Sequence, residues 1–197
     1  MLDASPNPYF CAMCLMVAFV FAGAVQVTWL YSKVARRFGK PIDGGRLYRG
    51  RRLFGDNKTW RGFVAMIPAT GVAFLLLGLF QRVLPPERQD WLWPIALWQY
   101  ALLGCWAGFG FMLAELPNSF LKRRMGAVPG QIPHQRWARV TCFILDQIDS
   151  VVGALLALSL FVPVPMMTWL ILLVSGTVVH WLFNVILFFV GAKTRAG

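Results

Sequence analysis

The sequence predicts an all-α integral membrane protein of about five transmembrane helices. We expect the N-terminus outside, the C-terminus inside and two long cytoplasmic loops. Three observations predict this class. Of the 197 residues, 58% are hydrophobic, against about 45–50% in soluble domains. The apolar residues collect in long runs separated by charged stretches, as in polytopic membrane proteins. Basic residues gather in alternate loops, which indicates the orientation.

Five apolar runs are long enough to span a bilayer, which takes roughly 20 residues. They cover about 10–31, 62–80, 92–115, 141–162 and 166–190. No basic stretch or cleavage site accompanies the first run, so we expect a retained span and not a signal peptide. The sequence VPVP at 162–165 predicts a tight turn between the last two runs. The length suits a single membrane-embedded domain over 1–197.

The basic residues fix the predicted orientation. Ten of the 19 Lys and Arg lie in the loop 32–61, five lie in 116–140 and two lie in the C-terminal tail. Only Arg82 and Arg88 fall on the other side. Because cytoplasmic loops carry the excess of Lys and Arg, both long loops are predicted to face the cytoplasm.

Charge and cysteine content exclude two classes of function. A net charge of +11 would suggest nucleic acid in a soluble protein. Here the charge lies beside apolar runs, so we expect no nucleic acid, and anionic membrane lipids and phosphate ligands instead. Cys11 and Cys14 form one CxxC without a second pair. They therefore indicate apolar packing and not a zinc site.

Two acids open the fourth run. Asp146 and Asp149 share a helix face at the spacing i, i+3. Two like charges this close repel each other, and a charged Asp at a span centre costs roughly 2.5–3.5 kcal/mol. A divalent cation removes both penalties, and oxygen ligands beside substrate phosphates suit Mg²⁺. The alternative is that each acid pairs with a nearby arginine, Arg136 or Arg139.

A third acid ends the third run. Glu115 precedes Pro117, which is expected to break the helix there. Asn118 or Ser119 would then cap a short new helix. The cations that follow, Lys122 and Arg123, would make its N-terminus a phosphate site. The alternative is an ordinary capped helix at the membrane interface.

The first long loop ends in LFGDNKTWRGF, residues 53–63. Glycine with an acid or amide favours a turn, and cations and a hydroxyl follow it. This stretch could bind a polyphosphate, although the Walker A spacing is absent. Its candidate substrate-binding residues are Asp56, Asn57, Lys58, Thr59 and Arg61. The alternative is plain anchoring of the second span.

Together these motifs resemble the CTP-dependent lipid-phosphate cytidylyltransferases. SFLKRR (119–124) followed by LDQIDS (145–150) is similar to the S-x-x-K-R and L-D-R-x-D-S signature of phosphatidate cytidylyltransferases. GDNKTWRG (55–62) resembles the D-G-K-T-W-R-G element of the CDP-archaeol synthase branch, where L-D-Q-x-D is also usual. Departures from the pattern are Asn57 for Gly, Ala114 and Glu115 for a Gly-Asp pair, and a longer segment over 130–143.

The resemblance implies transfer of CMP from CTP to a membrane lipid phosphate, with Mg²⁺ as cofactor. It implies Asp146, Asp149 and Lys122 as catalytic residues, with Glu115 joining the two aspartates on the metal. Asn118, Ser119 and Arg123 would bind substrate together with the loop residues named above. A prokaryotic inner membrane is the expected location, with the active site facing the cytoplasm. A homodimer is left open.

Three other functions are alternatives to a cytidylyltransferase. A CDP-alcohol phosphotransferase would need D-G-x-x-A-R, which is absent. A membrane transporter would distribute polar residues through the bilayer, whereas these acids cluster at one edge. A non-catalytic membrane scaffold with an anion or metal site would explain the departures at Asn57, Glu115 and Pro117.

Overall fold

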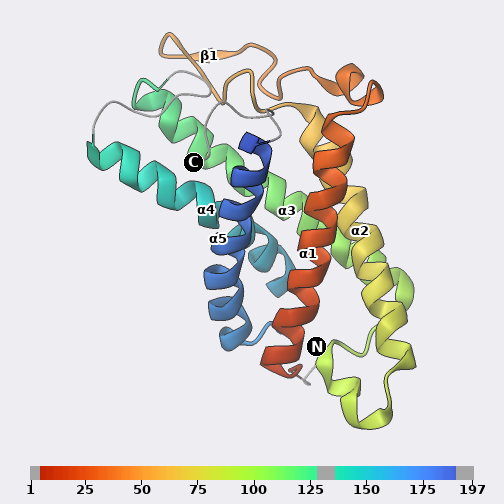
Figure 1. Ribbon diagram of the computed structural model, residues 1–197. Coiled ribbons are helices and arrows are strands. Elements are labelled where there is room, and N and C mark those ends of the chain that lie inside the picture. The colour runs from red at the N-terminus through yellow and green to blue at the C-terminus, as the bar shows by residue number, and fades with distance from the viewer. Residues whose placement is uncertain (1–4, 128–135, 190–197) are drawn as a thin grey trace.

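The computed structural model describes residues 5–127 and 136–189. Two 3-10 helices, η1 (Val34–Phe38) and η2 (Pro86–Trp91), lie in the connections. So does a two-stranded antiparallel sheet of β1 (Leu47–Tyr48) and β2 (Arg51–Arg52). The long helices are α1 (Pro8–Leu30), α2 (Trp60–Val83), α3 (Leu97–Arg124), α4 (Arg136–Ser159) and α5 (Met166–Phe189), and they pack together as one bundle (Figure 1).

The predicted all-helical membrane class is confirmed. Within the described residues, four helices are long and apolar enough to cross a membrane: Pro8–Leu30, Trp60–Val83, Leu97–Arg124 and Val140–Ser159. The described part of the chain adds a shorter apolar helix, Met166–Val179, within α5. The count of five spans and their orientation stay predictions.

Buried apolar side chains from all five long helices form the main core. Leu15, Phe74, Leu155 and Leu172 belong to it. Cys11 and Cys14 are buried there as free thiols, which confirms their packing role.

Two aromatic side chains tie together the end of the bundle near the N-terminus. Trp93 and Tyr100 are fully buried, and each has a polar group that needs a partner. The Tyr100 hydroxyl donates to the carbonyl of Trp93 at 2.6 Å. The Trp93 indole donates to the carbonyl of Pro163 at 2.8 Å. These bonds join the start of α3 to the turn between α4 and α5.

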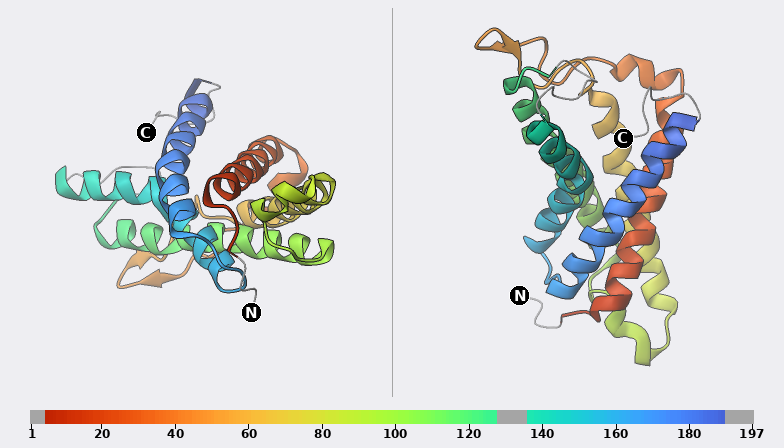
Figure 2. Two further views of the ribbon diagram at one scale, coloured as in Figure 1. Left: turned by 90° about the horizontal axis from the view of Figure 1, so that it is seen from below. Right: turned by 60° about the vertical axis from the view of Figure 1, so that its left-hand side comes forward.

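A pair of glycines lets α3 and α4 approach closely. A Cβ at Gly153 would lie 2.3 Å from the carbonyl oxygen of Gly110. A Cβ at Gly110 would lie 2.5 Å from the carbonyl of Gly153. Small residues of this kind allow close backbone contact between membrane helices. As a result, α3 and α4 run side by side (Figures 1 and 2), and their polar residues face each other.

The predicted helix break at Pro117 is wrong. α3 continues without interruption to Arg124, with Pro117 inside it. A proline removes one N–H, and neighbouring helices can compensate for this in a membrane bundle. Asn118 and Ser119 therefore lie within α3, both buried, and do not cap a new helix.

The signal that ends α3 is a glycine further on. Gly126 has a φ of +80°, the left-handed conformation common just after helices. Its N–H donates to the carbonyl of Arg123, and the N–H of Ala127 donates to that of Lys122. This pair of bonds is the Schellman arrangement.

The loop between α1 and α2 is folded over the bundle end. Its residues 40–42 run antiparallel to 58–60, with Pro41 bridged to Thr59. The hairpin of β1 and β2, which lies within the same loop, docks on the C-terminal end of α3 (Figure 1). Arg124 donates to the carbonyl of Arg52 at 2.7 Å, and Arg51 donates to that of Arg124 at 2.6 Å. Each element therefore satisfies carbonyl groups of the other.

Candidate active site

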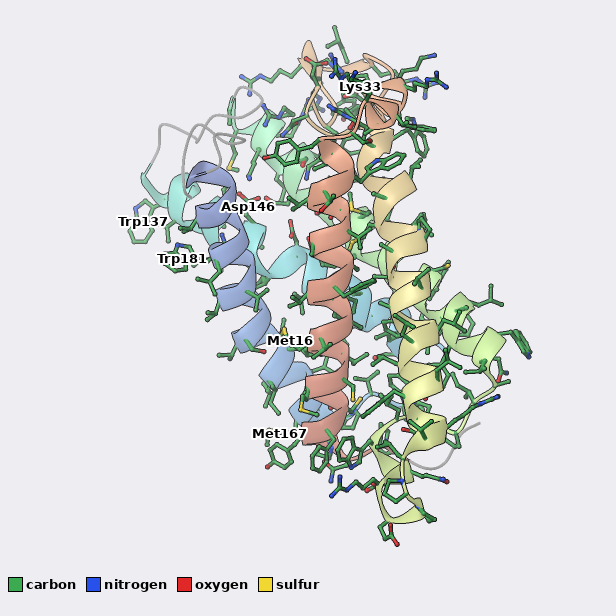
Figure 3. All side chains as sticks on the ribbon, turned by 45° about the vertical axis from the view of Figure 1, so that its right-hand side comes forward. Met16, Lys33, Trp137, Asp146, Met167 and Trp181 are labelled. Carbon is green, nitrogen blue, oxygen red and sulfur yellow. The ribbon has the colours of Figure 1, made fainter. Side chains whose placement is uncertain are left out.

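One face of α3 meets one face of α4 in a polar cluster. Glu115, Asn118 and Lys122 follow the spacing i, i+3, i+7, which places them on the same side of α3. Asp146 and Asp149 lie opposite on α4. In Figure 3, Asp146 lies toward the end of the bundle that carries Lys33, and Met16 and Met167 lie toward the other end.

Asn118 bridges the two aspartates. Its Nδ2 donates to Asp146 Oδ1 at 2.7 Å and to Asp149 Oδ2 at 2.9 Å. One amide thus holds the carboxylates that the spacing predicted on one face. Hydrogen bonds to charged acceptors are worth about 1.5–3 kcal/mol each. The bridge therefore offsets much of the repulsion between the two acids.

Two lysines bring positive charge to the cluster. Lys122 forms an ion pair with Asp146, and Lys58 forms one with Glu115. Arg136 and Arg139, the alternative partners of the aspartates, have side chains outside the described residues. Burial alone would lower the pKa of Lys58. The charge of Glu115 and its hydrogen bond outweigh this, and the pKa lies above its ordinary value of 10.5.

Ser150 completes the connection between the acids. Its side chain is fully buried. The Oγ donates to Glu115 Oε1 at 3.2 Å, and the backbone N–H donates to Asp149 Oδ1 at 2.7 Å. The cluster therefore runs without interruption from Lys58 through Glu115 and the two aspartates to Lys122.

A cavity of about 150 Å³ lies beside the pair of Lys58 and Glu115. Residues of α1, α2, α3 and the loop before α2 line it. Asn57 and Thr59 line its polar end, and Gln26 faces it from α1. Its remaining lining is mostly apolar, with Leu30, Ile42, Phe63, Met112 and Leu116.

Four of the predicted site residues are not joined to the three carboxylates by a hydrogen bond or ion pair in the described part of the chain. Asp56 is exposed and pairs with Arg52. Arg123 is buried and donates to the carbonyl of Ala127 at the helix end. Ser119 is buried in α3, and Arg61 has a buried Nε that lacks a hydrogen-bond partner among the described residues.

Asp43 is the residue that sequence reasoning missed. Its carboxylate has no exposed surface, and it pairs with Arg52 at 2.6 Å. Burial would raise the pKa of Asp43. The hydrogen bonds from Arg52 and from three backbone N–H groups outweigh this and hold the pKa well below 3.8. The signal was IDGG at 42–45, since an Asp before glycines favours a turn closed by its own side chain.

The donor chemistry of the cluster fits Mg²⁺. Mg²⁺ is usually bound through one or two carboxylates together with substrate phosphates, and one further oxygen, Asn118 Oδ1, is buried without a hydrogen-bond partner among the described residues. In the described part of the chain, no group of three or more His, Cys, Asp or Glu is arranged as a metal site. Asn118 and Lys122 contact the aspartate oxygens that a cation would use.

Residues 14–195 match the sequence model of a family described as CarS-like, CDP-archaeol synthase. The chain belongs to the CarS-like CDP-archaeol synthase family. This confirms the resemblance found in the motifs. The match covers nearly the whole chain, whereas the motifs cover only short segments of it.

Relatives of this CarS-like chain carry the same description. A CDP-archaeol synthase of Halobacterium salinarum is 43% identical over 126 residues, which cover 64% of this chain and 62% of that protein. The match thus spans just under two thirds of its length. The CDP-archaeol synthase of Halorubrum lacusprofundi is 36% identical over 172 residues, with 80% and 83% covered. That of Methanoculleus marisnigri is 33% identical, with 79% and 88% covered.

A solved structure shares the fold of this CarS-like protein. It is described as an intramembrane enzyme for archaeal membrane lipids biosynthesis. The TM-score is 0.58 at 24% identity, and the match covers 88% of this chain and 89% of the other.

Proposed function

We propose that this protein transfers CMP from CTP to the phosphate of a membrane lipid, forming a CDP-activated lipid and pyrophosphate. One observation carries the proposal. The loop before α2, the C-terminal half of α3 and the middle of α4 bring Lys58, Lys122 and three carboxylates into one connected cluster. A transporter would place such groups along a path through the membrane.

The reaction needs no strong general base. An oxygen of the lipid phosphate, ionised near neutral pH, attacks the α-phosphorus of CTP. The bond from that phosphorus to the bridging oxygen of the β-phosphate breaks, and pyrophosphate leaves with the electron pair. Positioning and charge neutralisation carry most of the catalysis in such transfers.

The residues of the cluster have distinct parts in this proposal. The ammonium groups of Lys58 and Lys122 neutralise charge that develops on the leaving pyrophosphate. The cavity beside Lys58 admits part of the nucleotide. Asp146, Asp149 and Glu115 would hold Mg²⁺, which supplies Lewis-acid neutralisation of phosphate oxygens when bound. The remaining predicted substrate contacts are Asp56, Asn57, Thr59, Arg61, Asn118, Ser119 and Arg123.

The acceptor we propose is an archaeol-type ether lipid phosphate. The relatives described above are named CDP-archaeol synthases, and a diacylglycerol phosphate is the competing acceptor. We infer that the cluster faces the cytoplasm, because the loops at that end carry most of the basic residues.

The test uses the purified protein in detergent with Mg²⁺ and CTP labelled at the α-phosphate. Labelled CDP-lipid and one pyrophosphate per product are expected with the ether lipid phosphate, at a higher kcat/KM than with diacylglycerol phosphate. Asp149→Asn should lower turnover at least a hundredfold while the protein keeps its elution profile and Tm. Absence of labelled lipid with either acceptor would overturn the function. Full turnover in the variant would overturn the role of Asp149.

A further inference from the structure

Asp43 lies at the centre of the loop that carries Lys58. Its Oδ2 accepts hydrogen bonds from the N–H groups of Phe54 and Gly55, each at 3.1 Å. Its Oδ1 accepts from the N–H of Gly45 at 3.0 Å and from Arg52 at 2.6 Å. Both oxygens are therefore needed as acceptors.

The segment around Asp43 also holds Lys58 through the backbone. The N–H of Ile42 donates to the carbonyl of Lys58 at 2.9 Å, and the N–H of Trp60 donates to that of Lys40 at 3.2 Å. Asp43 thus holds residues 54 and 55, and its neighbour Ile42 holds residue 58. Both ends of the short segment 54–58 are therefore fixed by hydrogen bonds. The side chain of Lys58 then reaches Glu115, 57 residues away in the chain.

We propose that Asp43 is a positioning residue that sets the location of the Lys58 ammonium against Glu115 and the cavity. Asp43 is not itself part of the cavity lining, although its neighbour Ile42 is, and the hydrogen bonds of its carboxylate go to Gly45, Arg52, Phe54 and Gly55 and not to the cluster. Its effect on turnover passes through Lys58. The activity arm of the test rests on the proposed function, whereas the chemical arm does not.

The chemical arm compares two lysines. Lys58 and Lys122 each pair with a carboxylate, and their side chains are 22% and 18% exposed. Lys122 lies on α3 and forms its ion pair with Asp146 of α4, whereas Lys58 belongs to the loop itself. Its reactivity is therefore an internal control for general loosening of the bundle end.

The labelling experiment uses acetic anhydride on the full-length protein in detergent, with peptide mass spectrometry. Asp43→Asn should raise the acetylation rate of Lys58 at least fivefold, because an amide offers one acceptor oxygen in place of two. The rate at Lys122 should stay within twofold. Glu87→Gln is the matched control, because it removes a carboxylate at the opposite end of the bundle, on η2. It should change neither rate. Equal rates at Lys58 in the variant and the parent would overturn the proposal, as would a parallel rise at both lysines.

The activity arm is a double-mutant cycle on kcat/KM for CTP. Asp43→Asn should lower kcat/KM at least tenfold in the parent protein and less than twofold in the Lys58→Gln background. Equal factors in both backgrounds would show that Asp43 acts independently of Lys58 and would overturn the inference. A parent protein without CDP-lipid formation would overturn the proposed function alone, and the labelling result then decides the role of Asp43. If Lys58→Gln itself leaves no turnover, the labelling result likewise decides the role of Asp43.

A second variant covers failure of Asp43→Asn to fold. Arg52→Gln removes the charged partner and leaves the three backbone donors to Asp43. It should raise the Lys58 acetylation rate by a smaller factor, at least twofold, with Lys122 unchanged. An unchanged rate at Lys58 in this variant counts against the proposal in the same way.

Discussion

Individual side chains in and near this site stabilise charged groups by short-range hydrogen bonds and ion pairs. Asn118 shows this, since one amide group contacts two carboxylates that would otherwise repel each other. Asp43 shows it in the loop, where a buried carboxylate organises donors that are distant in the sequence. Removal of such a residue leaves the buried groups among its partners without hydrogen bonds, which costs about 1–3 kcal/mol for each buried group.

Asp43 should make the stability of the protein depend on pH. Its pKa is held below 3.8 in the folded protein, so the unfolded chain takes up a proton first as the pH falls. The stability that Asp43 contributes is therefore full well above pH 3.8 and is lost as the pH falls toward the folded-state pKa.

The measurement is the Tm of the parent protein minus that of Asp43→Asn, followed by tryptophan fluorescence in detergent from pH 7 to pH 3. The difference should be constant between pH 7 and pH 5 and should shrink toward pH 3. A Tm difference that stays the same at every pH would show that the charge of Asp43 contributes nothing to stability.

At the level of elements, the contact between α3 and α4 decides whether the site forms. The two helices carry five of the six side chains in the connected cluster of lysines, acids and amide, and their backbones meet at Gly110 and Gly153. A wider separation would move Asn118 away from the aspartates.

Gly153→Ala should therefore destabilise the protein and disturb the site. The new Cβ would lie 2.3 Å from a backbone carbonyl, which cannot move without moving α3. Overpacking of this kind costs about 1–3 kcal/mol. Gly176→Ala is the matched control, because its Cβ would lie 2.9 Å from a methyl of Val151, which can shift. Thermal unfolding should show a clearly lower Tm for Gly153→Ala than for Gly176→Ala. Equal values would contradict the close-contact account.

The sequence could predict features that depend on local spacing. The i, i+3 pair of Asp146 and Asp149 was visible because helix geometry alone determines which face they share. The contact of Lys58 with Glu115 was not visible, since it depends on how the loop folds back over α3. Pro117 was misread because its local preference for ending a helix is weaker than packing inside a bundle.

At the scale of the whole molecule, the two ends of the bundle differ in charge. The loop with β1 and β2 is strongly basic, whereas the opposite end carries Arg82 in the last turn of α2 and Arg88 in η2. The family match and the four long apolar helices place the protein in a membrane. The excess of Lys and Arg predicts that the basic end faces the cytoplasm, and this orientation can be tested directly.

Cysteines placed at the two ends should report the orientation. In a protein with Cys105 replaced by Ser, Arg49→Cys should react with a membrane-impermeant maleimide only after the cells are opened. Arg88→Cys should react in intact cells. Both positions are exposed, and the other native thiols, Cys11, Cys14 and Cys142, are buried. The reverse pattern would invert the predicted topology.

The two ends of the bundle are also held by different forces. Neutral hydrogen bonds of Trp93 and Tyr100 close one end, and partly exposed ion pairs hold the other. Dissolved salt weakens the attraction between charges that water reaches, less so for partly buried pairs such as these, and leaves neutral, buried bonds almost unaffected. Rising ionic strength should thus loosen the end that carries the lysines and acids by a small amount while the aromatic end stays closed, so that hydrogen exchange quickens slightly at one end only.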